Sequence, residues 1–314
     1  MKATAARLIE HGKPLDVTEV DLPEPQADEV VIDMKYGGVN PVDRNRALGR
    51  VNSDAPLPRT LGAEGVGTVD GAMFVVFGHG VGASREGIWA TKAVVPRAAL
   101  VPVPEGVDPQ HAAVMGVAGV TAWRTVTELA QVTPEDRVLV LGATGGVGSV
   151  IASFTSHLGA EVWGQTGDEA GAAWLSELGV QRIVGSGPED LAEHVRPWRP
   201  TVVFDPLGGD YTAAALQSMA PHGRLVSFGT SANPTSTVSM QAVYSSGLRI
   251  FGYAGLLESE EDTRQGLVEA LRALAERRLD VVVDSAVPLA RANEAFDLLA
   301  ARKVKGKLVL DLQG

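Results

Sequence analysis

The chain has 314 residues, a formal net charge of −11 and no cysteine. This length predicts one large or two modest domains, and the missing cysteine excludes disulfides, thiolate metal ligands and cysteine catalysis. The negative charge argues against a nucleic-acid surface. No apolar run reaches the length of a membrane span, and the start MKATAARLIEHGK lacks the apolar core of a signal peptide. We therefore expect a cytoplasmic globular protein that contacts neither nucleic acid nor membrane.

The N-terminal third predicts a small, curved β-rich domain, because short apolar segments alternate there with proline and glycine. Gly62, Gly65 and Gly67 precede Val69 and predict a bent strand. The other expected strands are residues 4–9, 30–36, 73–77, 88–95 and 100–103.

From about Pro109 the pattern changes to alternating helices and strands, which is typical of a doubly wound parallel sheet. The expected strands are residues 138–141, 161–165, 182–184, 201–205, 224–228 and 248–253. The expected helices are residues 109–115, 121–129, 172–178 and 211–219. The C-terminal helices 262–277 and 290–301, with strands 281–283 and 307–312, do not extend this alternation. We expect that part to pack back on the N-terminal β domain.

The stretch from residue 136 to 158 predicts a dinucleotide site. An apolar strand at 138–141 leads into a glycine-dense turn, and apolar residues then recur at helical spacing. In this context the pyrophosphate of a dinucleotide lies against backbone N–H groups at the helix start. Gly145 permits close backbone approach, and Gly148 lets the helix lie close to the strand. Because Ala143 replaces the first glycine of the fingerprint, an ordinary glycine-rich turn remains the alternative.

Short motifs spread over the chain carry a family resemblance. They are VNPVD at 39–43, GAEGVG at 62–67, GVTAW at 119–123, GATGGVG at 142–148, FD with GG at 204–209, GR at 223–224 and VKGK at 304–307. Their order resembles that of the medium-chain dehydrogenase/reductase superfamily, in its zinc-free quinone oxidoreductase and enoyl reductase branch. The loop at 77–83 is most similar to the acrylyl-CoA reductase group.

This resemblance implies an α/β fold of two domains. A Rossmann dinucleotide-binding domain with a doubly wound parallel sheet is expected at residues 113–254. A discontinuous, GroES-like, β-rich catalytic domain is expected at residues 1–112 and 255–314. The resemblance also implies a homodimer that pairs edge to edge through the sixth strand of the parallel sheet.

The positions that match the zinc ligands of the family are Asn40, Ala63 and Val117, which do not form a credible Zn²⁺ ligand set. We therefore expect no zinc, and hydride transfer to a carbon that the substrate itself activates. Asn40 and Thr121 are expected to contact nicotinamide or substrate. The alternatives are a turn residue before Pro41 and a plain helix cap.

The resemblance implies a set of cofactor-binding residues. They are Asn40, Thr121, Thr144, Gly145, Gly146, Val147, Gly148, Gly167, Ser186, Phe228, Gly229, Thr230, Phe251, Gly252 and Tyr253. The catalytic residue is unknown, because Asn45 stands where some relatives place a tyrosine. Tyr253 and His79 are the other candidates for a proton donor. The basic run at 302–307 is expected to be a solvated helix end, with contact to a phosphate as the alternative.

The second strand ends at Thr166, without the acidic residue that binds a ribose 2′-hydroxyl, which favours NADPH. Gly171 and Ser186 stand at the positions of the lysine and tyrosine used for the 2′-phosphate, and Asp168 would repel it, so NADH is not excluded. Arg182 is the one nearby cation.

These observations predict a zinc-independent, NADPH-dependent oxidoreductase that reduces a small-molecule quinone or α,β-unsaturated carbonyl. One alternative is an enoyl-thioester reductase like the acrylyl-CoA group. An alternative of another class is a nicotinamide-binding protein with little turnover, acting in redox sensing or protein interaction.

Overall fold

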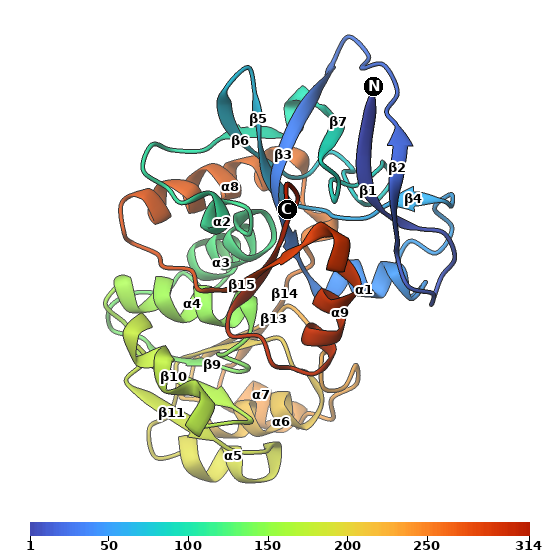
Figure 1. Ribbon diagram of the computed structural model, residues 1–314. Coiled ribbons are helices and arrows are strands. Elements are labelled where there is room, and N and C mark those ends of the chain that lie inside the picture. The colour runs from blue at the N-terminus through green and yellow to red at the C-terminus, as the bar shows by residue number, and fades with distance from the viewer. The chain divides into compact units, whose positions relative to one another are not determined.

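The computed structural model describes residues 1–314, which form two compact units (Figure 1). Unit 1 comprises residues 1–120, 259–275 and 282–314, and unit 2 comprises residues 121–258 and 276–281. The domain boundaries expected from the sequence stay a prediction beside this division. No helix combines the length and the apolar character that crossing a membrane requires.

Unit 1 is built on two β-sheets. Its strands are β1 (Lys2–Leu8), β2 (Asp16–Asp21), β3 (Glu29–Val39), β4 (Arg59–Thr60), β5 (Gly65–Val69), β6 (Ala72–Val76), β7 (Lys92–Pro96), β8 (Leu100–Pro102), β15 (Val283–Pro288) and β16 (Lys307–Asp311). A small sheet has the order β2-β1-β4. The larger sheet has the order β15-β16-β3-β5-β6-β8, and β7 also pairs with β3. The sequence predicted neither β2 nor β4.

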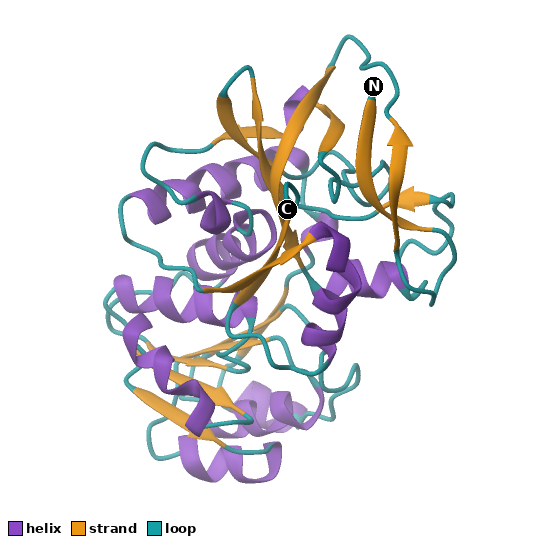
Figure 2. Cartoon of the chain, in the orientation of Figure 1, coloured by secondary structure: helices purple, strands orange, loops and turns teal.

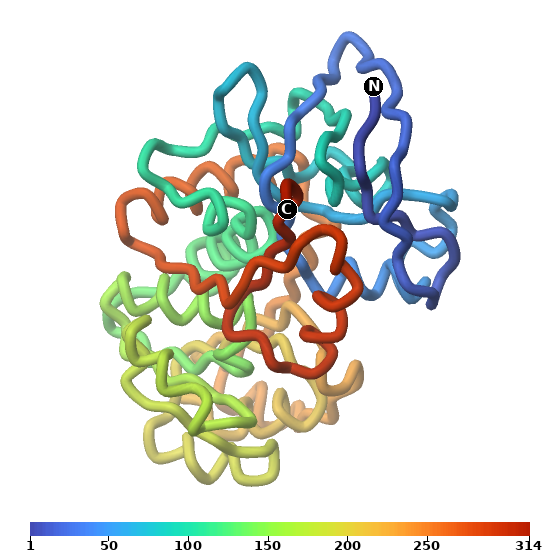
Figure 3. The backbone as a smooth tube through the Cα atoms, in the orientation of Figure 1, coloured from blue at the N-terminus to red at the C-terminus, as the bar shows by residue number.

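The C-terminal strand confirms that the end of the chain packs back on the N-terminal β domain. Strand β16 pairs antiparallel with β3, with Leu308 opposite Val39, so the red end of the chain lies beside a blue segment (Figure 3).

The bend predicted at Gly62 has a steric cause. Gly62 has a φ of +101°, and a Cβ there would lie 2.3 Å from the fully buried ring of Trp89. The strand predicted at 88–95 is shorter in the structure, because residues 88–91 lie outside β7.

The helices of unit 1 are short except for two near the C-terminus. They are α1 (Pro41–Ala47), α2 (Pro109–Ala112), α8 (Glu260–Ala275) and α9 (Ala292–Ala300). The helix predicted at 121–129 is instead α3 (Val120–Trp123) followed by a π-helical segment, Arg124–Leu129.

Unit 2 contains a six-stranded parallel sheet, which confirms the expected doubly wound fold. The strands are β9 (Arg137–Val140), β10 (Glu161–Thr166), β11 (Arg182–Gly185), β12 (Val202–Asp205), β13 (Arg224–Ser227) and β14 (Arg249–Gly252). Their order is β11-β10-β9-β12-β13-β14, in which the strand order reverses at β9. Strand β9 pairs with β10 on one side and β12 on the other, and its residues Val138 to Val140 are buried.

Helices surround the strands of unit 2 (Figure 2). They are α4 (Gly146–His157), α5 (Pro188–Val195), α6 (Gly209–Ser218) and α7 (Met240–Ser245). The helix predicted at 172–178 is a 3₁₀ segment, Ala170–Leu178, and the sequence missed α5 and α7.

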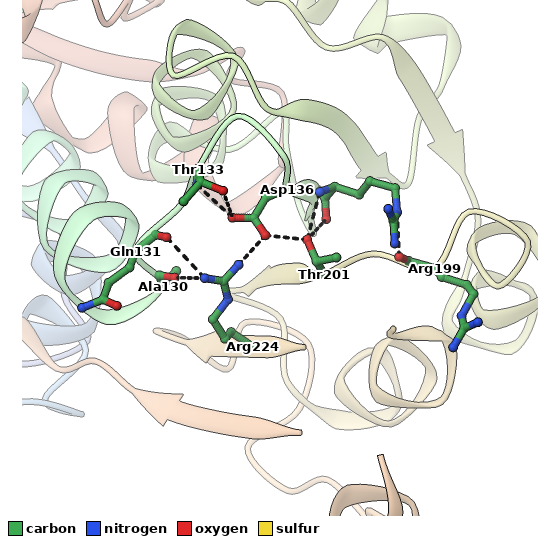
Figure 4. A network of polar contacts seen from close by, with 8 residues as sticks. Ala130, Gln131, Thr133, Asp136, Arg199, Thr201 and Arg224 are labelled. Atoms are coloured by element: carbon green, nitrogen blue, oxygen red, sulfur yellow. Dashed lines mark hydrogen bonds and ion pairs between the residues drawn. The ribbon is translucent and has the colours of Figure 1, made fainter. Parts of the chain in front are cut away.

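A polar cluster ties together the amino ends of three strands in unit 2 (Figure 4). Arg224, the first residue of β13, forms an ion pair with Asp136 and donates to the carbonyl of Ala130 at 2.7 Å. The hydroxyl of Thr201, just before β12, donates to Asp136 Oδ1 at 2.7 Å. Because strands of a parallel sheet share one direction, this cluster lies at the end opposite to their carboxyl edge.

Candidate cofactor and substrate site

The glycine-rich turn leaves the start of helix α4 open. Gly145 has extended dihedral angles (φ −76°, ψ 163°) and is the N-cap of α4, and no side chain caps this helix. The first N–H groups of a helix have no partner within it. Because Gly145 also carries no side chain, the N–H groups of Gly146, Val147 and Gly148 are available to an anion.

Two glycines of this turn have different roles. A Cβ at Gly148 would lie 2.4 Å from the carbonyl oxygen of Gly142, so any side chain there displaces the backbone of the turn. A Cβ at Gly145 would lie 3.2 Å from the same oxygen, which a small shift relieves. Gly148 is therefore required by the fold, whereas the fold would accept a small side chain at Gly145.

Gln165, near the end of β10, connects the turn to the next strand. Its Oε1 accepts a hydrogen bond from the Gly142 N–H at 3.1 Å, and its Nε2 donates to the Ser186 carbonyl at 2.8 Å. Ser186 is 6% exposed, and its hydroxyl has no partner. Sequence reasoning missed Gln165, although its place one residue before the end of the second strand is a signal for such a bridge.

An acidic residue, Asp168, follows the carboxyl end of β10, and one of its carboxylate oxygens caps a turn. Asp168 Oδ1 accepts from the Gly171 N–H at 3.0 Å, and the Asp168 N–H donates to Thr166 Oγ1 at 3.2 Å. Arg182 lies elsewhere, because it begins β11 opposite Trp163 and its guanidinium lies 4.4 Å from the centre of that ring. The nearby cation expected from the sequence is therefore at the amino end of the strand, away from Thr166.

The remaining residues expected to bind the cofactor in unit 2 follow strands that end in register. Asp205, Ser227 and Gly252 lie opposite one another in β12, β13 and β14. The fold therefore brings the predicted residues of unit 2 to one edge of the sheet, where doubly wound proteins bind ligands. They are Thr121, Thr144 to Gly148, Gly167, Ser186, Phe228 to Thr230 and Phe251 to Tyr253, and their contact with a cofactor stays a prediction.

Thr121 and Tyr253 meet within unit 2, since their side chains share a hydrogen bond. Burial and the carboxylate of Glu258 raise the pKa of Tyr253 to about 12. Arg124 binds this carboxylate at 2.6 Å. A tyrosine with this pKa stays protonated at neutral pH but is a weak acid.

In unit 1, Asn40 belongs to a buried polar cluster with Glu64 and Lys307. Asn40 is 2% exposed, and its Nδ2 donates to Glu64 Oε1 at 2.7 Å. The Lys307 ammonium donates to Asn40 Oδ1 at 2.5 Å and to Glu64 Oε1 at 3.0 Å. The second carboxylate oxygen, Oε2, accepts from the Val117 N–H at 2.7 Å. We name Asn40, Glu64 and Lys307 the amide–ion cluster.

Lys307 corrects the expectation that the whole basic run at 302–307 is solvated. Its side chain is only 3% exposed. Lys307 is the first residue of β16, a strand whose side chains are buried on both faces of the sheet. Glu64 and Lys307 both lie in motifs that carried the family resemblance, yet sequence reasoning assigned neither to a site.

His79 lines an open pocket of about 650 Å³ in unit 1. Its N–H donates to Glu260 Oε2 at 2.8 Å, and Ser84, Arg85 and Arg97 also line the pocket. Asn40 is not among the lining residues.

Asp43, in helix α1, is completely buried beside this cluster. Burial raises its pKa from 3.8 to about 6, although Arg46 and the N–H of Asn40 oppose the shift. Because the folded chain binds this proton more tightly than the unfolded chain, Asp43 lowers the free energy of unfolding as the pH rises from about 4 to about 6. The effect is about 3 kcal/mol.

We therefore expect Asp43→Asn to remove a pH dependence of about 3 kcal/mol between pH 4 and 6, which urea unfolding at several pH values would measure. Asp33→Asn is the matched control, because the Asp33 side chain is 56% exposed. Identical pH profiles for the wild type and Asp43→Asn would contradict the assignment.

The fold and the glycine turn are those of a dinucleotide-binding protein, and the comparisons with known proteins are in line with this. Residues 178–310 match the family model described as zinc-binding dehydrogenase. The chain is 30% identical over 312 residues to one subunit of the phenolphthiocerol/phthiocerol polyketide synthase of Mycobacterium tuberculosis. That match covers 95% of this chain but only 14% of the synthase subunit.

Two quinone oxidoreductases match over their whole length. The enzyme of Salmonella typhimurium is 26% identical over 328 residues, which cover 98% of this chain and 99% of that one. The solved quinone oxidoreductase of Thermus thermophilus, described also in complex with NADPH, has a TM-score of 0.86 at 28% identity. The match covers 98% of this chain and 100% of the Thermus thermophilus chain. In sequence and fold, the chain is similar to quinone oxidoreductases over its whole length, in line with the resemblance to the medium-chain dehydrogenase/reductase superfamily.

A zinc ion, which the name of the matching family model implies, does not fit the residues at the amide–ion cluster. An ammonium group has no lone pair to offer a metal, and Lys307 is bonded to both possible oxygen ligands, Asn40 Oδ1 and Glu64 Oε1. Ala63 and Val117 have apolar side chains. A Cβ at Gly38 or Gly116 would lie 2.6 or 2.9 Å from the Glu64 carboxylate, so the space around this group is already filled.

Proposed function

We propose that this protein is a zinc-independent, NADPH-dependent oxidoreductase that reduces a quinone or an α,β-unsaturated carbonyl by hydride transfer. The observation that carries the proposal is the uncapped start of α4 behind Gly145, which offers backbone donors to a pyrophosphate. The two full-length quinone oxidoreductases support the choice of reaction.

The dinucleotide, when bound, supplies the hydride. The protein itself holds the two reactants in line, donates hydrogen bonds to the oxygen that gains charge, and excludes water. Backbone N–H groups from Gly146 to Gly148 hold the phosphates. Asn40 and Thr121 contact the nicotinamide or the substrate. Water or another group supplies the proton that completes the reduction, because Asn45 stands where some relatives place a tyrosine.

The preference for NADPH has two supports. The Thermus thermophilus relative is described in complex with NADPH. In this chain, the second strand ends at Thr166, without an acidic residue for a ribose 2′-hydroxyl. NADH is the competing cofactor, because no lysine or arginine lies between residues 138 and 181.

Enoyl-thioester reduction is the second candidate, and the match to a segment of a polyketide synthase favours it. A nicotinamide-binding protein with little turnover, acting in redox sensing or protein interaction, is the third. We place this protein in the cytoplasm. The rate at which the purified protein oxidises NADPH, measured with quinones, enones and enoyl-CoA thioesters, distinguishes the three candidate functions. Tight NADPH binding without turnover on any of these substrates would sink the enzymatic proposal.

We also propose a homodimer that forms through β14, an edge strand of the parallel sheet. Apolar side chains are exposed on and after this strand, with Ile250 46%, Leu256 67% and Leu257 86% exposed. An unpaired apolar edge is a template for pairing with a second chain.

A dimeric mass by light scattering is expected for the wild type, and a monomeric mass for Ile250→Lys, because the added charge would be buried in the interface. Ile9→Lys is the matched control, since Ile9 is 50% exposed and lies outside the parallel sheet. A wild-type monomer, or an Ile250→Lys dimer, would refute this interface.

A further inference from the structure

The side-chain amide of Asn40 is bonded at its two ends to opposite charges. Its Oδ1 accepts from the Lys307 ammonium, and its Nδ2 donates to the Glu64 carboxylate. An ammonium group can only donate and an ionised carboxylate can only accept. Turning the amide over would place the NH₂ group against Nζ and the carbonyl oxygen against Oε1, so both bonds would be lost together. The charges therefore fix the orientation of the amide.

The cluster is closed to other partners. Glu64 is completely buried, and Lys307 is 3% exposed. The Val117 N–H occupies Glu64 Oε2, and the Asn40 N–H is held by Asp43 Oδ2 at 3.0 Å. An ion pair removed from water in this way loses little strength to screening by salt. After these bonds the NH₂ group of Asn40 retains one N–H that can donate elsewhere.

We propose that Lys307 is a positioning residue that acts through Asn40. Together with Glu64 it holds the amide so that Asn40 offers an N–H, and not a carbonyl oxygen, to its ligand. This inference rests on the proposed function, in which Asn40 contacts the nicotinamide or the substrate. The ligand atom is then an acceptor: a carboxamide oxygen of the nicotinamide, or the carbonyl oxygen of the substrate that becomes an enolate or phenolate.

The chain allows a chemical test, because it contains no cysteine. In Lys307→Cys, the single thiol is alkylated in the unfolded chain before refolding. Aminoethylation restores an ammonium on a side chain of nearly the same length as lysine, whereas propylation gives a neutral side chain of similar size. We expect the propylated variant to lose at least tenfold in kcat. The aminoethylated variant should recover most of that loss.

A second pair of variants separates positioning from folding. Glu64→Gln with Lys307→Met removes both charges at nearly constant volume, so no single charge is left buried. Combining these with Asn40→Ala should lower kcat no further than Asn40→Ala alone, because the ion pair acts through Asn40. Equal kcat for the aminoethylated and propylated variants would overturn the proposal. So would a triple variant whose kcat is clearly lower than that of Asn40→Ala alone.

The orientation of the amide can also be read without turnover. In protein labelled with ¹⁵N-asparagine, the NH₂ signals of Asn40 are those lost in Asn40→Ala. We expect one proton of this pair to be shifted downfield by the Glu64 carboxylate in the wild type and the aminoethylated variant, and not in the neutral pair variant. Unchanged signals in the neutral pair variant would refute the positioning role. Absence of wild-type turnover with this NMR pattern intact would instead remove the proposed function and leave the orientation of the amide established.

Discussion

Gly145→Val is expected to raise the NADPH Kd at least about 100-fold, which corresponds to about 2.7 kcal/mol. The side chain would stand at the N-cap of α4, where backbone N–H groups face the pyrophosphate. The fold should tolerate it, because the nearest atom to a Cβ at Gly145 is the Gly142 carbonyl oxygen at 3.2 Å. The measurement is a titration of nicotinamide fluorescence, together with urea unfolding.

Gly145→Ala is the graded control, with a smaller loss of affinity expected from its smaller side chain. Gly148→Ala supplies the contrast, since its Cβ would lie 2.4 Å from backbone and should destabilise the protein even without cofactor. An NADPH Kd for Gly145→Val equal to that of the wild type would place the cofactor elsewhere.

Arg224→Met is expected to destabilise the protein by about 3 kcal/mol, because it leaves the largely buried carboxylate of Asp136 without its cation. The carbonyl oxygen of Ala130 also loses its donor. Because this cluster lies at the amino ends of the strands, the NADPH Kd should stay within about twofold of the wild type. Urea unfolding and fluorescence titration measure the two quantities.

Arg249→Met is the matched control, because Arg249 is an exposed residue of β14. Asp136→Asn combined with Arg224→Met should recover part of the lost stability, since the unpaired charge is then removed. A loss below about 0.5 kcal/mol for Arg224→Met, the range of an ordinary surface substitution, would show that the ion pair does not clamp the strands.

The sequence predicted the parallel sheet well, because its strands are short apolar runs bounded by glycine, proline or acidic residues. It predicted the glycine turn for the same reason: the order of strand, turn and helix start is local information. Strand β2 was missed because its residues, DVTEVD, are polar and mostly exposed, and the strand forms only by pairing with β1.

The amide–ion cluster could not be derived from local patterns. Asn40, Glu64 and Lys307 are far apart in the chain, and they meet because β16 returns to pair with β3. Lysine is rarely fully buried, so a basic run is ordinarily read as solvent-exposed. Only the pairing of the last strand shows that Lys307 faces inward while its neighbours Lys303 and Lys305 stay exposed.

Isotope transfer tests whether this protein transfers a hydride without a metal. NADPH carrying deuterium at the transferable C4 position is incubated with an enone and with protein dialysed against a strong zinc chelator. The prediction is deuterium at the β-carbon of the product, formed at the same rate with and without the chelator. Label in the product only after zinc is added back, or no label at all, would contradict it.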